Sequence, residues 1–250
     1  MVKREVIGRY RGSFLGLLWS FVTPLLMLAI YTFVFGVVFQ VRLEQASLND
    51  NKFEFALLLF AGLIIFNLFS ECISRAPGLI LANVNYVKKI IFPLEILPWV
   101  ILGAAVFHAA ISLLVLLIFL LAIGQTISWT IICLPVVILP LLLLTMGLSW
   151  LLASLGVFVR DIGQFIGLAL TMLLFMSPIF YPASALPEGV RDYLFLNPLT
   201  FIIEQTRAVI LFGRLPDWGG LAIYYAVGLL VAWAGLAWFE KTRKGFADVL

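Results

Sequence analysis

Long apolar runs alternate with short polar segments along the whole of this 250-residue chain. Six runs can be counted, and each is near or above the length of about 20 residues that an α-helix needs to cross a bilayer. The runs are continuously apolar rather than alternating, which favours helices over the strands of a membrane barrel. The pattern therefore predicts an all-α polytopic membrane protein with a single transmembrane domain over residues 1–250. Its six spans are expected at about 14–39, 53–71, 96–123, 130–159, 162–180 and 219–239.

The composition agrees with a membrane location and excludes several functions. Hydrophobic residues make up 64% of the chain and charged residues only 12%, whereas a soluble protein keeps roughly a quarter of its residues charged. The net charge of +3 is too small and too dispersed to indicate nucleic-acid binding. Cys72 and Cys133 offer neither a disulfide framework nor metal-ligand spacing. With His108 as the one histidine, we expect no catalytic, cofactor-binding or metal-binding residue in this chain.

The distribution of Lys and Arg predicts which side of the membrane each segment faces. With the N-terminus inside, eleven of these 16 residues fall on cytoplasmic segments and five on the opposite side. Both termini are therefore expected in the cytoplasm.

Three segments outside the spans are more than simple links. The apolar side chains of the N-terminal stretch share one helical face, opposite Arg4 and Arg11, which fits an interfacial helix. These apolar residues are Val2, Val6, Tyr10 and Phe14. The alternative is a basic tail that only sets the orientation of the chain in the membrane. Residues 75–95 are too polar to cross the membrane and too long for a tight turn. Residues 181–218 form the largest outer segment, and the apolar stretch 199–212 within it fits a re-entrant or interfacial helix.

Ionisable residues in or beside the spans are candidates for function, because they are costly in lipid. His108 lies mid-span and has two interpretations, a helix–helix hydrogen bond or a contact with substrate. Glu71 and Arg75 are expected to form an i,i+4 pair at the end of the second span. Glu204 and Arg207 lie three residues apart in the outer apolar stretch, and they are either structural or face a polar exit.

One face of the first predicted span is less apolar than the rest of that helix. Ser20, Pro24, Met27, Tyr31 and Phe35 recur along it at steps of three and four residues. A stripe of this kind fits lipid badly, so it is either a packed helix interface or the wall of a substrate path.

The motifs of nucleotide hydrolysis and of common hydrolases do not occur in this sequence. It has no G-x-x-x-x-G-K-[ST] phosphate loop, no G-x-S-x-G and no H-E-x-x-H. The chain is therefore not expected to bind or hydrolyse ATP by itself.

Four sequence blocks follow one another in a specific order. They are RYRGSFLGLLWSFVTPL at 9–25 with YTFVFG at 31–36, KKIIFPLEILP at 88–98, SPIFYP at 177–182, and NPLT at 197–200. Together they resemble the ABC-2 type permeases that export polysaccharides, and Glu204 and Arg207 follow the last block as in that family. The resemblance covers nearly the whole chain, although relatives usually have a longer N-terminal arm.

The resemblance implies a six-span protomer with an N-terminal interfacial helix, a cytoplasmic coupling helix and outer gate helices. It also implies a second copy of the chain and two separate ATP-binding cassette subunits, which would hold the ATP and Mg. The complex would move a lipid-linked polysaccharide, such as an O-antigen, across the cell inner membrane. In this interpretation the chain is a transport subunit and not an enzyme.

Candidate site residues follow from the resemblance together with the stripe on the first span. The interfacial entry would use Arg9, Tyr10 and Arg11, and the coupling to the ATPase would use Asn83, Asn85, Tyr86, Lys88 and Lys89 within 75–95. The outer gate within 181–218 would include Tyr181, Asn197, Glu204 and Arg207. The substrate path would be lined by Ser20, Met27, Tyr31 and Phe35 from the first span and by Phe165, Met172, Phe175 and Phe180 from the fifth.

Two other functions remain as alternatives. An ABC-2 permease that exports a drug or another lipid would have the same architecture. A membrane-embedded glycosyl- or acyltransferase would need a cluster of acids, bases or metal ligands, and the lone His108 argues against it. A neighbouring ATPase gene would separate a transporter from an enzyme, and neighbouring sugar-nucleotide genes would separate polysaccharide export from drug export.

Overall fold

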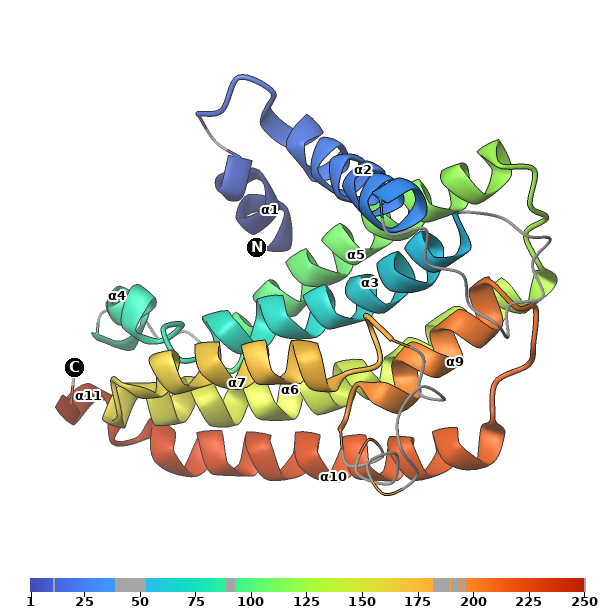
Figure 1. Cartoon of the computed structure of the whole chain (residues 1–250). Helices are drawn as coiled ribbons and strands as arrows, with labels where there is room; N and C mark the ends of the chain where they lie inside the picture. Colours follow the sequence, from blue (N-terminus) through green and yellow to red (C-terminus); the bar gives the residue numbers. More distant parts are fainter. Residues whose placement is uncertain are drawn as a thin grey trace.

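The computed structural model describes residues 1–10, 12–38, 53–88, 93–181, 189, 194 and 197–249, which contain helices and no strand. The helices shown in Figure 1 are α1 (Val2–Tyr10), α2 (Trp19–Tyr31), α3 (Glu54–Arg75), α4 (Val84–Lys88), α5 (Ile96–Ala122), α6 (Leu134–Phe158), α7 (Ile162–Met176), α9 (Thr200–Ile210), α10 (Trp218–Arg243) and α11 (Phe246–Val249). Short 3₁₀ segments precede α2, α4 and α6 (Gly16–Leu18, Leu81–Asn83 and Trp129–Cys133), and α2 continues into a π-helical segment at Thr32–Val38. The predicted all-α fold is confirmed.

Five segments of the described chain are long and apolar enough to cross a membrane, and they coincide with five of the six predicted spans. The remaining prediction, 162–180, corresponds to the shorter helix α7 of 15 residues, or about 22 Å at 1.5 Å per residue. Helix α7 ends at Met176 because Ser177, which precedes Pro178, has the extended conformation that a following proline favours. The count of six spans therefore stays a prediction. The five segments are Gly16–Phe35, Phe55–Arg75, Ile96–Ala122, Trp129–Phe158 and Trp218–Arg243.

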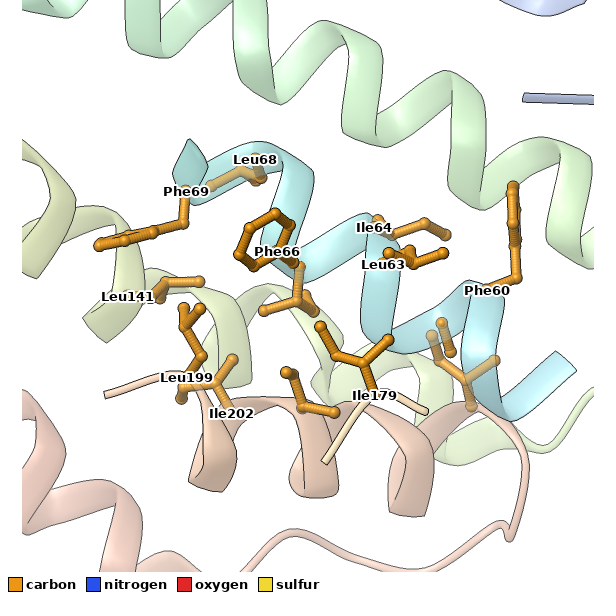
Figure 2. Packing of buried hydrophobic residues seen from close by; sticks show 14 of the residues in the cluster. Phe60, Leu63, Ile64, Phe66, Leu68, Phe69, Leu141, Ile179, Leu199 and Ile202 are labelled. Atoms are coloured by element: carbon orange, nitrogen blue, oxygen red, sulfur yellow. The ribbon is translucent and has the colours of Figure 1, made fainter. Parts of the chain in front are cut away.

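Helix α3 is the central helix of the bundle. In the most apolar stretch of α3, 78% of the residues are buried, compared with 11% of those in the span that contains α2 and 17% of those in α10. Figure 2 shows Phe66 and Phe69 of α3 beside Leu141 of α6 and Ile202 of α9, within the main apolar cluster. Since lipid tails are as apolar as these side chains, this packing stabilises the bundle through close van der Waals contact.

Helices α6 and α10 run side by side with their backbones in close approach (Figure 1). A Cβ atom on Gly147 of α6 would overlap the carbonyl group of Val231 in α10, and one on Gly235 would overlap the carbonyl group of Gly147. Small residues allow this approach, which is a main source of helix association in membranes. The two helices form one tightly packed pair.

The bundle has two distinct ends in Figure 1. Helices α4 and α11 lie at one end, here called the α4 end, together with the last turns of α3, α6 and α10. Helix α9 lies toward the opposite end, here called the α9 end.

Helices α1 and α2 pack on one side of the bundle, against α5 and α3. Helix α1 buries Val6, as the predicted apolar face requires. The expectation that Phe14 shares this face is wrong, because the helix ends at Tyr10 and Gly12 then adopts a φ of 89° that turns the chain. The Phe14 side chain is fully exposed.

Candidate functional site

A cleft of about 1240 Å³ lies between α1 and α2 on one side and α3 and α5 on the other. Helix α2 contributes Ser20, Met27 and Tyr31, and α1 contributes Arg9 and Tyr10. Residues predicted for the interfacial entry and for the substrate path therefore lie in the same cleft. The opposite wall combines hydroxyl and amide groups with charged side chains from α3 and α5 (Asn67, Ser70, Glu71, Ser74, Arg75, His108 and Ser112).

The stripe on the first span divides between the cleft and the core. Ser20 lies in the cleft wall, where its hydroxyl donates to the Leu17 carbonyl at 2.7 Å, and Met27 is 42% exposed there. Phe35, at the far end of the stripe, packs instead on Phe55 of α3, with ring centroids 5.0 Å apart. The stripe is thus a packed helix interface at Phe35 and a cleft wall at Ser20 and Met27, and the substrate path stays a prediction.

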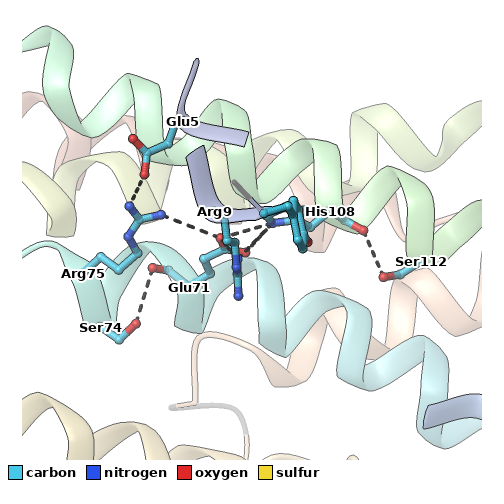
Figure 3. A network of polar contacts seen from close by, with 8 residues as sticks. Glu5, Arg9, Glu71, Ser74, Arg75, His108 and Ser112 are labelled. Atoms are coloured by element: carbon cyan, nitrogen blue, oxygen red, sulfur yellow. Dashed lines mark hydrogen bonds and ion pairs between the residues drawn. The ribbon is translucent and has the colours of Figure 1, made fainter. Parts of the chain in front are cut away.

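A network of charged side chains lines one part of the cleft, and Figure 3 shows its contacts. The Arg9 guanidinium donates from Nη1 to Oε1 of Glu71 at 2.6 Å, which joins α1 to α3. Arg75 also lies near this carboxylate, with Nη1 and Oε1 3.9 Å apart, so the predicted i,i+4 pair is present. The closer partner of Arg75 is Glu5, whose carboxylate accepts from Nη2. Two ion pairs therefore fasten α1 to the last turn of α3.

His108 adds α5 to this network. Its Nδ1 lies 3.0 Å from Oε2 of Glu71, and its Nε2 lies 3.4 Å from the Tyr10 hydroxyl. Because a carboxylate only accepts, a hydrogen bond to Glu71 requires the proton on Nδ1, and Nε2 can then accept from the Tyr10 hydroxyl. Burial raises the pKa of the Tyr10 phenol, so this hydroxyl stays protonated and able to donate. The helix–helix hydrogen bond considered for His108 is present, and the ring also lines the cleft.

The arrangement fastens α1 to α3 and α5. Each guanidinium of the network has a carboxylate partner, and the carboxylates lie on α1 and α3. This network of Glu5, Arg9, Glu71, Arg75 and His108, here called the latch, fixes how α1 lies beside the cleft.

The residues predicted for the fifth span do not reach this cleft. Phe165, Met172 and Phe175 are exposed on α7, and Phe180 stacks on Phe175 at 5.8 Å between ring centroids. Only Leu174 of α7 is part of the cleft lining. Within one chain, then, the two predicted walls of the substrate path are not brought together.

Arg207 is the most deeply buried cation among the described residues, with 8% of its surface exposed. Its guanidinium donates to three backbone carbonyls: Nε to Leu58 at 2.9 Å, Nη1 to Pro178 at 2.6 Å and Nη2 to Ile179 at 3.2 Å. Glu204 is exposed on the same helix and forms no ion pair with Arg207. This geometry agrees with the structural interpretation of Arg207, since the guanidinium connects α3, α9 and the turn after α7.

The other outer-segment residues that were predicted are also anchored. Asn197 donates from Nδ2 to the Ser177 hydroxyl at 2.9 Å and accepts at Oδ1 from the Leu199 amide. Tyr181 donates to the Phe175 carbonyl at 2.9 Å. These bonds tie the start of α9 to the end of α7.

Four of the five predicted coupling residues lie at the α4 end: Asn83, Asn85, Tyr86 and Lys88. Asn83 donates to the Leu79 carbonyl at 2.9 Å, Asn85 is exposed, and Tyr86 packs against a second apolar cluster formed by α5, α6, α10 and α11. The backbone of Lys88 closes α4, whereas Lys89 and Arg11 lie outside the described residues.

The chain has the features of a polytopic helical membrane protein: apolar helices of spanning length, a polar cleft between them, and an N-terminal helix held by ion pairs. The family model described as ABC-2 type transporter matches residues 1–211, and the chain belongs to this family.

Alignments with known proteins cover almost the full length of this chain. It is 32% identical to the O-antigen export system permease protein RfbA of Myxococcus xanthus over 250 residues, which cover 99% of this chain and 93% of the relative. The protein of the same description from Klebsiella pneumoniae is 28% identical over 252 residues, covering 100% and 93%. The polysialic acid transport protein KpsM of Escherichia coli is 26% identical over 253 residues, covering 96% and 91%.

Proposed function

We propose that this chain is the permease subunit of an ATP-driven exporter that moves a lipid-linked polysaccharide across the inner membrane. The observation that carries this proposal is the 32% identity to an O-antigen export permease over 99% of the chain. Relatives described by polysialic acid transport and by capsule polysaccharide export match over comparable lengths, which favours a polysaccharide over a drug as cargo.

The cleft supports a path for a glycan. Sugar rings present hydroxyls and apolar C–H faces, so a polymer that slides needs many weak contacts of both kinds rather than a few tight ones. Ser20, Met27 and Tyr31 supply a hydroxyl, a thioether and a phenol ring along one side of the cleft.

A second copy of the chain would complete this path. Phe165, Met172 and Phe175 form an exposed row on α7, and Met27 and Phe33 are exposed on the first span. Rings and thioethers of this kind suit contact with a partner or with cargo as well as contact with lipid. In a homodimer, α7 of one copy could face the first span of the other, which would restore the two-walled path that a single chain lacks.

Two separate ATP-binding cassette subunits, with their bound ATP and Mg, would dock on the α4 end. The excess of Lys and Arg on the predicted cytoplasmic segments supports a cytoplasmic position for this end and for both termini. Helix α4 would be the coupling helix, and Tyr86 its aromatic anchor. A membrane-impermeant thiol reagent applied to intact cells should spare a cysteine placed at the exposed position Asn85.

The alternative function, a membrane-embedded glycosyl- or acyltransferase, fits the cleft less well. It would need an acid, base or metal site, whereas the ionisable residues of the cleft are engaged in the network that fastens α1.

ATP hydrolysis by purified components tests the proposal. The chain alone in nanodiscs should hydrolyse no ATP, and hydrolysis should appear when the ATP-binding subunit from the same gene cluster is added. A subunit whose phosphate-loop lysine is replaced serves as the control and should restore nothing. Hydrolysis by the chain alone at the rate of the complex would overturn the assignment.

A further inference from the structure

Glu95 connects the end of the 75–95 segment to two distant helices. Its carboxylate accepts at Oε2 from Arg243 Nη1 at 2.9 Å, and its backbone carbonyl accepts from Trp150 Nε1 at 3.0 Å. Arg243 is the last residue of α10, and Trp150 lies in α6. The residue directly before α5 is thus bonded to both members of the tightly packed α6–α10 pair.

The C-terminal turn reinforces this connection. Phe246 of α11 is fully buried, with its ring centroid 5.5 Å from that of Phe239 and 5.9 Å from that of Phe158. The cluster around Phe246 includes Ile80 and Leu94, which flank α4 in the chain. Helix α11 therefore packs beside the coupling segment and not only at the end of α10.

The same helix pair reaches the α9 end. The Tyr225 hydroxyl of α10 donates to the Val136 carbonyl of α6 at 2.8 Å. In the 3₁₀ segment before α6, the Thr130 hydroxyl donates to the Val209 carbonyl of α9 at 2.7 Å. A continuous set of contacts thus leads from the coupling segment through α6 and α10 to α9.

The pair formed by Glu95 and Arg243 is poorly suited to stabilising the fold. Its side chains are 33% and 39% exposed, and ion pairs with this much solvent contribute little to stability. The apolar cluster around Phe246 and Trp150 supplies the packing at this end. What the ion pair adds is a direct link between the end of the 75–95 segment and the end of α10.

We propose that Glu95 and Arg243 are positioning residues that transmit movement of the coupling segment to the α6–α10 pair and onward to α9. The inference rests on the proposed function, since the movement would come from a docked ATP-hydrolysing subunit. Replacing either residue should uncouple ATP hydrolysis from export while leaving the permease folded and its partner bound.

The test uses the full chain with its partner ATPase, as wild type and as Glu95→Gln, Arg243→Gln and the exchanged pair Glu95→Arg with Arg243→Glu. The control is Lys241→Gln, which removes an exposed cation from the same helix end. Surface polysaccharide is measured in cells that lack the native gene, and ATP hydrolysis, subunit association and melting temperature are measured on the purified complex.

We expect export per ATP hydrolysed to fall by about 2- to 30-fold in the single variants, the range expected when a coupling network is interrupted. Association and melting temperature should stay near wild type, the exchanged pair should recover export, and Lys241→Gln should match wild type. Unchanged export per ATP in both single variants would overturn the inference. A loss of export that follows a lowered melting temperature, without recovery in the exchanged pair, would also overturn it. A wild-type chain that binds no ATPase would instead contradict the proposed function itself.

Discussion

The Glu71 carboxylate and the His108 imidazole meet between α3 and α5, with Oε2 and Nδ1 3.0 Å apart and each side chain only 16% exposed. Arg9 reaches the same carboxylate from α1, so one acidic side chain holds three helices together. Ionisable groups in a membrane are costly unless they are paired, and this pairing accounts for a lone histidine and an acid within apolar helices. The latch also determines how α1 lies beside the cleft.

Glu71→Ala should loosen α1. The substitution removes the shared acceptor of Arg9 and His108, and hydrogen bonds to charged groups contribute about 1.5–3 kcal/mol. Both guanidiniums near Glu71 are more than a third exposed and can turn toward water, which limits the cost. We expect a lowered melting temperature in detergent and faster proteolytic cleavage near α1.

Ser74→Ala is the matched control for Glu71→Ala, because Ser74 lies one turn further along α3 and makes only a weak bond of 3.4 Å to the Glu71 carbonyl. It should behave like wild type. Equal cleavage rates in the Glu71 variant and the wild type would mean that the latch does not hold α1.

Arg207→Lys should destabilise the protein although it keeps the charge. The planar guanidinium donates hydrogen bonds to the carbonyls of Leu58, Pro178 and Ile179. A lysine ammonium cannot donate in the same planar arrangement. At least one buried carbonyl would lose its donor, at a cost of about 1–3 kcal/mol. Unfolding in detergent measures the change, and Glu204→Gln, at an exposed position of the same helix, should stay within about 0.5 kcal/mol of wild type. If the two variants were equally stable, Arg207 would not be the anchor described above.

Cysteine labelling tests whether the cleft is a hydrated path. In a chain with Cys72 and Cys133 replaced, a cysteine at Met27 should react with a water-soluble thiol reagent, because Met27 lies in the cleft and is 42% exposed. A cysteine at Leu28 should stay protected, since Leu28 is buried in the core. Reaction at Leu28 with none at Met27 would show that the wrong helix face has been assigned.

Tyr86→Ala should weaken association with the ATPase. Aromatic anchors often dominate protein interfaces, and truncation of such an anchor costs at least about 2 kcal/mol, or a roughly thirtyfold loss of affinity. Co-purification and titration of the two subunits measure this loss of affinity. Tyr86→Phe, which keeps the ring, should retain most of the affinity; equal affinity in Tyr86→Ala and wild type would remove Tyr86 from the docking site.

The local pattern of apolar and polar residues was sufficient to predict the helices and part of the cleft lining. Continuous apolar runs predicted the five helices of the described residues that are long and apolar enough to span, and the helix predicted within 199–212 is present as α9 (Thr200–Ile210). The polar stripe also predicted that Ser20, Met27 and Tyr31 share one side, which now lies in the cleft.

The contacts between distant segments could not be predicted in this way. Arg9 and Glu71 are 62 residues apart, and Glu95 and Arg243 are 148 apart, so helical periodicity says nothing about either pair. The one available signal was chemical, because an acid at the end of one span and a histidine within another should each seek a partner. Hydropathy also overestimated the fifth span, since Pro178 ends α7 although the residues beyond it remain apolar.

A deletion strain tests whether this chain is the permease that exports a lipid-linked polysaccharide. Surface polysaccharide and membrane-bound lipid-linked glycan are measured in the deletion strain, with and without the wild-type chain supplied from a plasmid. We expect polymer to disappear from the surface of the deletion strain while lipid-linked glycan accumulates inside, and the plasmid to reverse both changes. Unchanged surface polymer, or a loss of glycan synthesis without internal accumulation, would contradict this expectation.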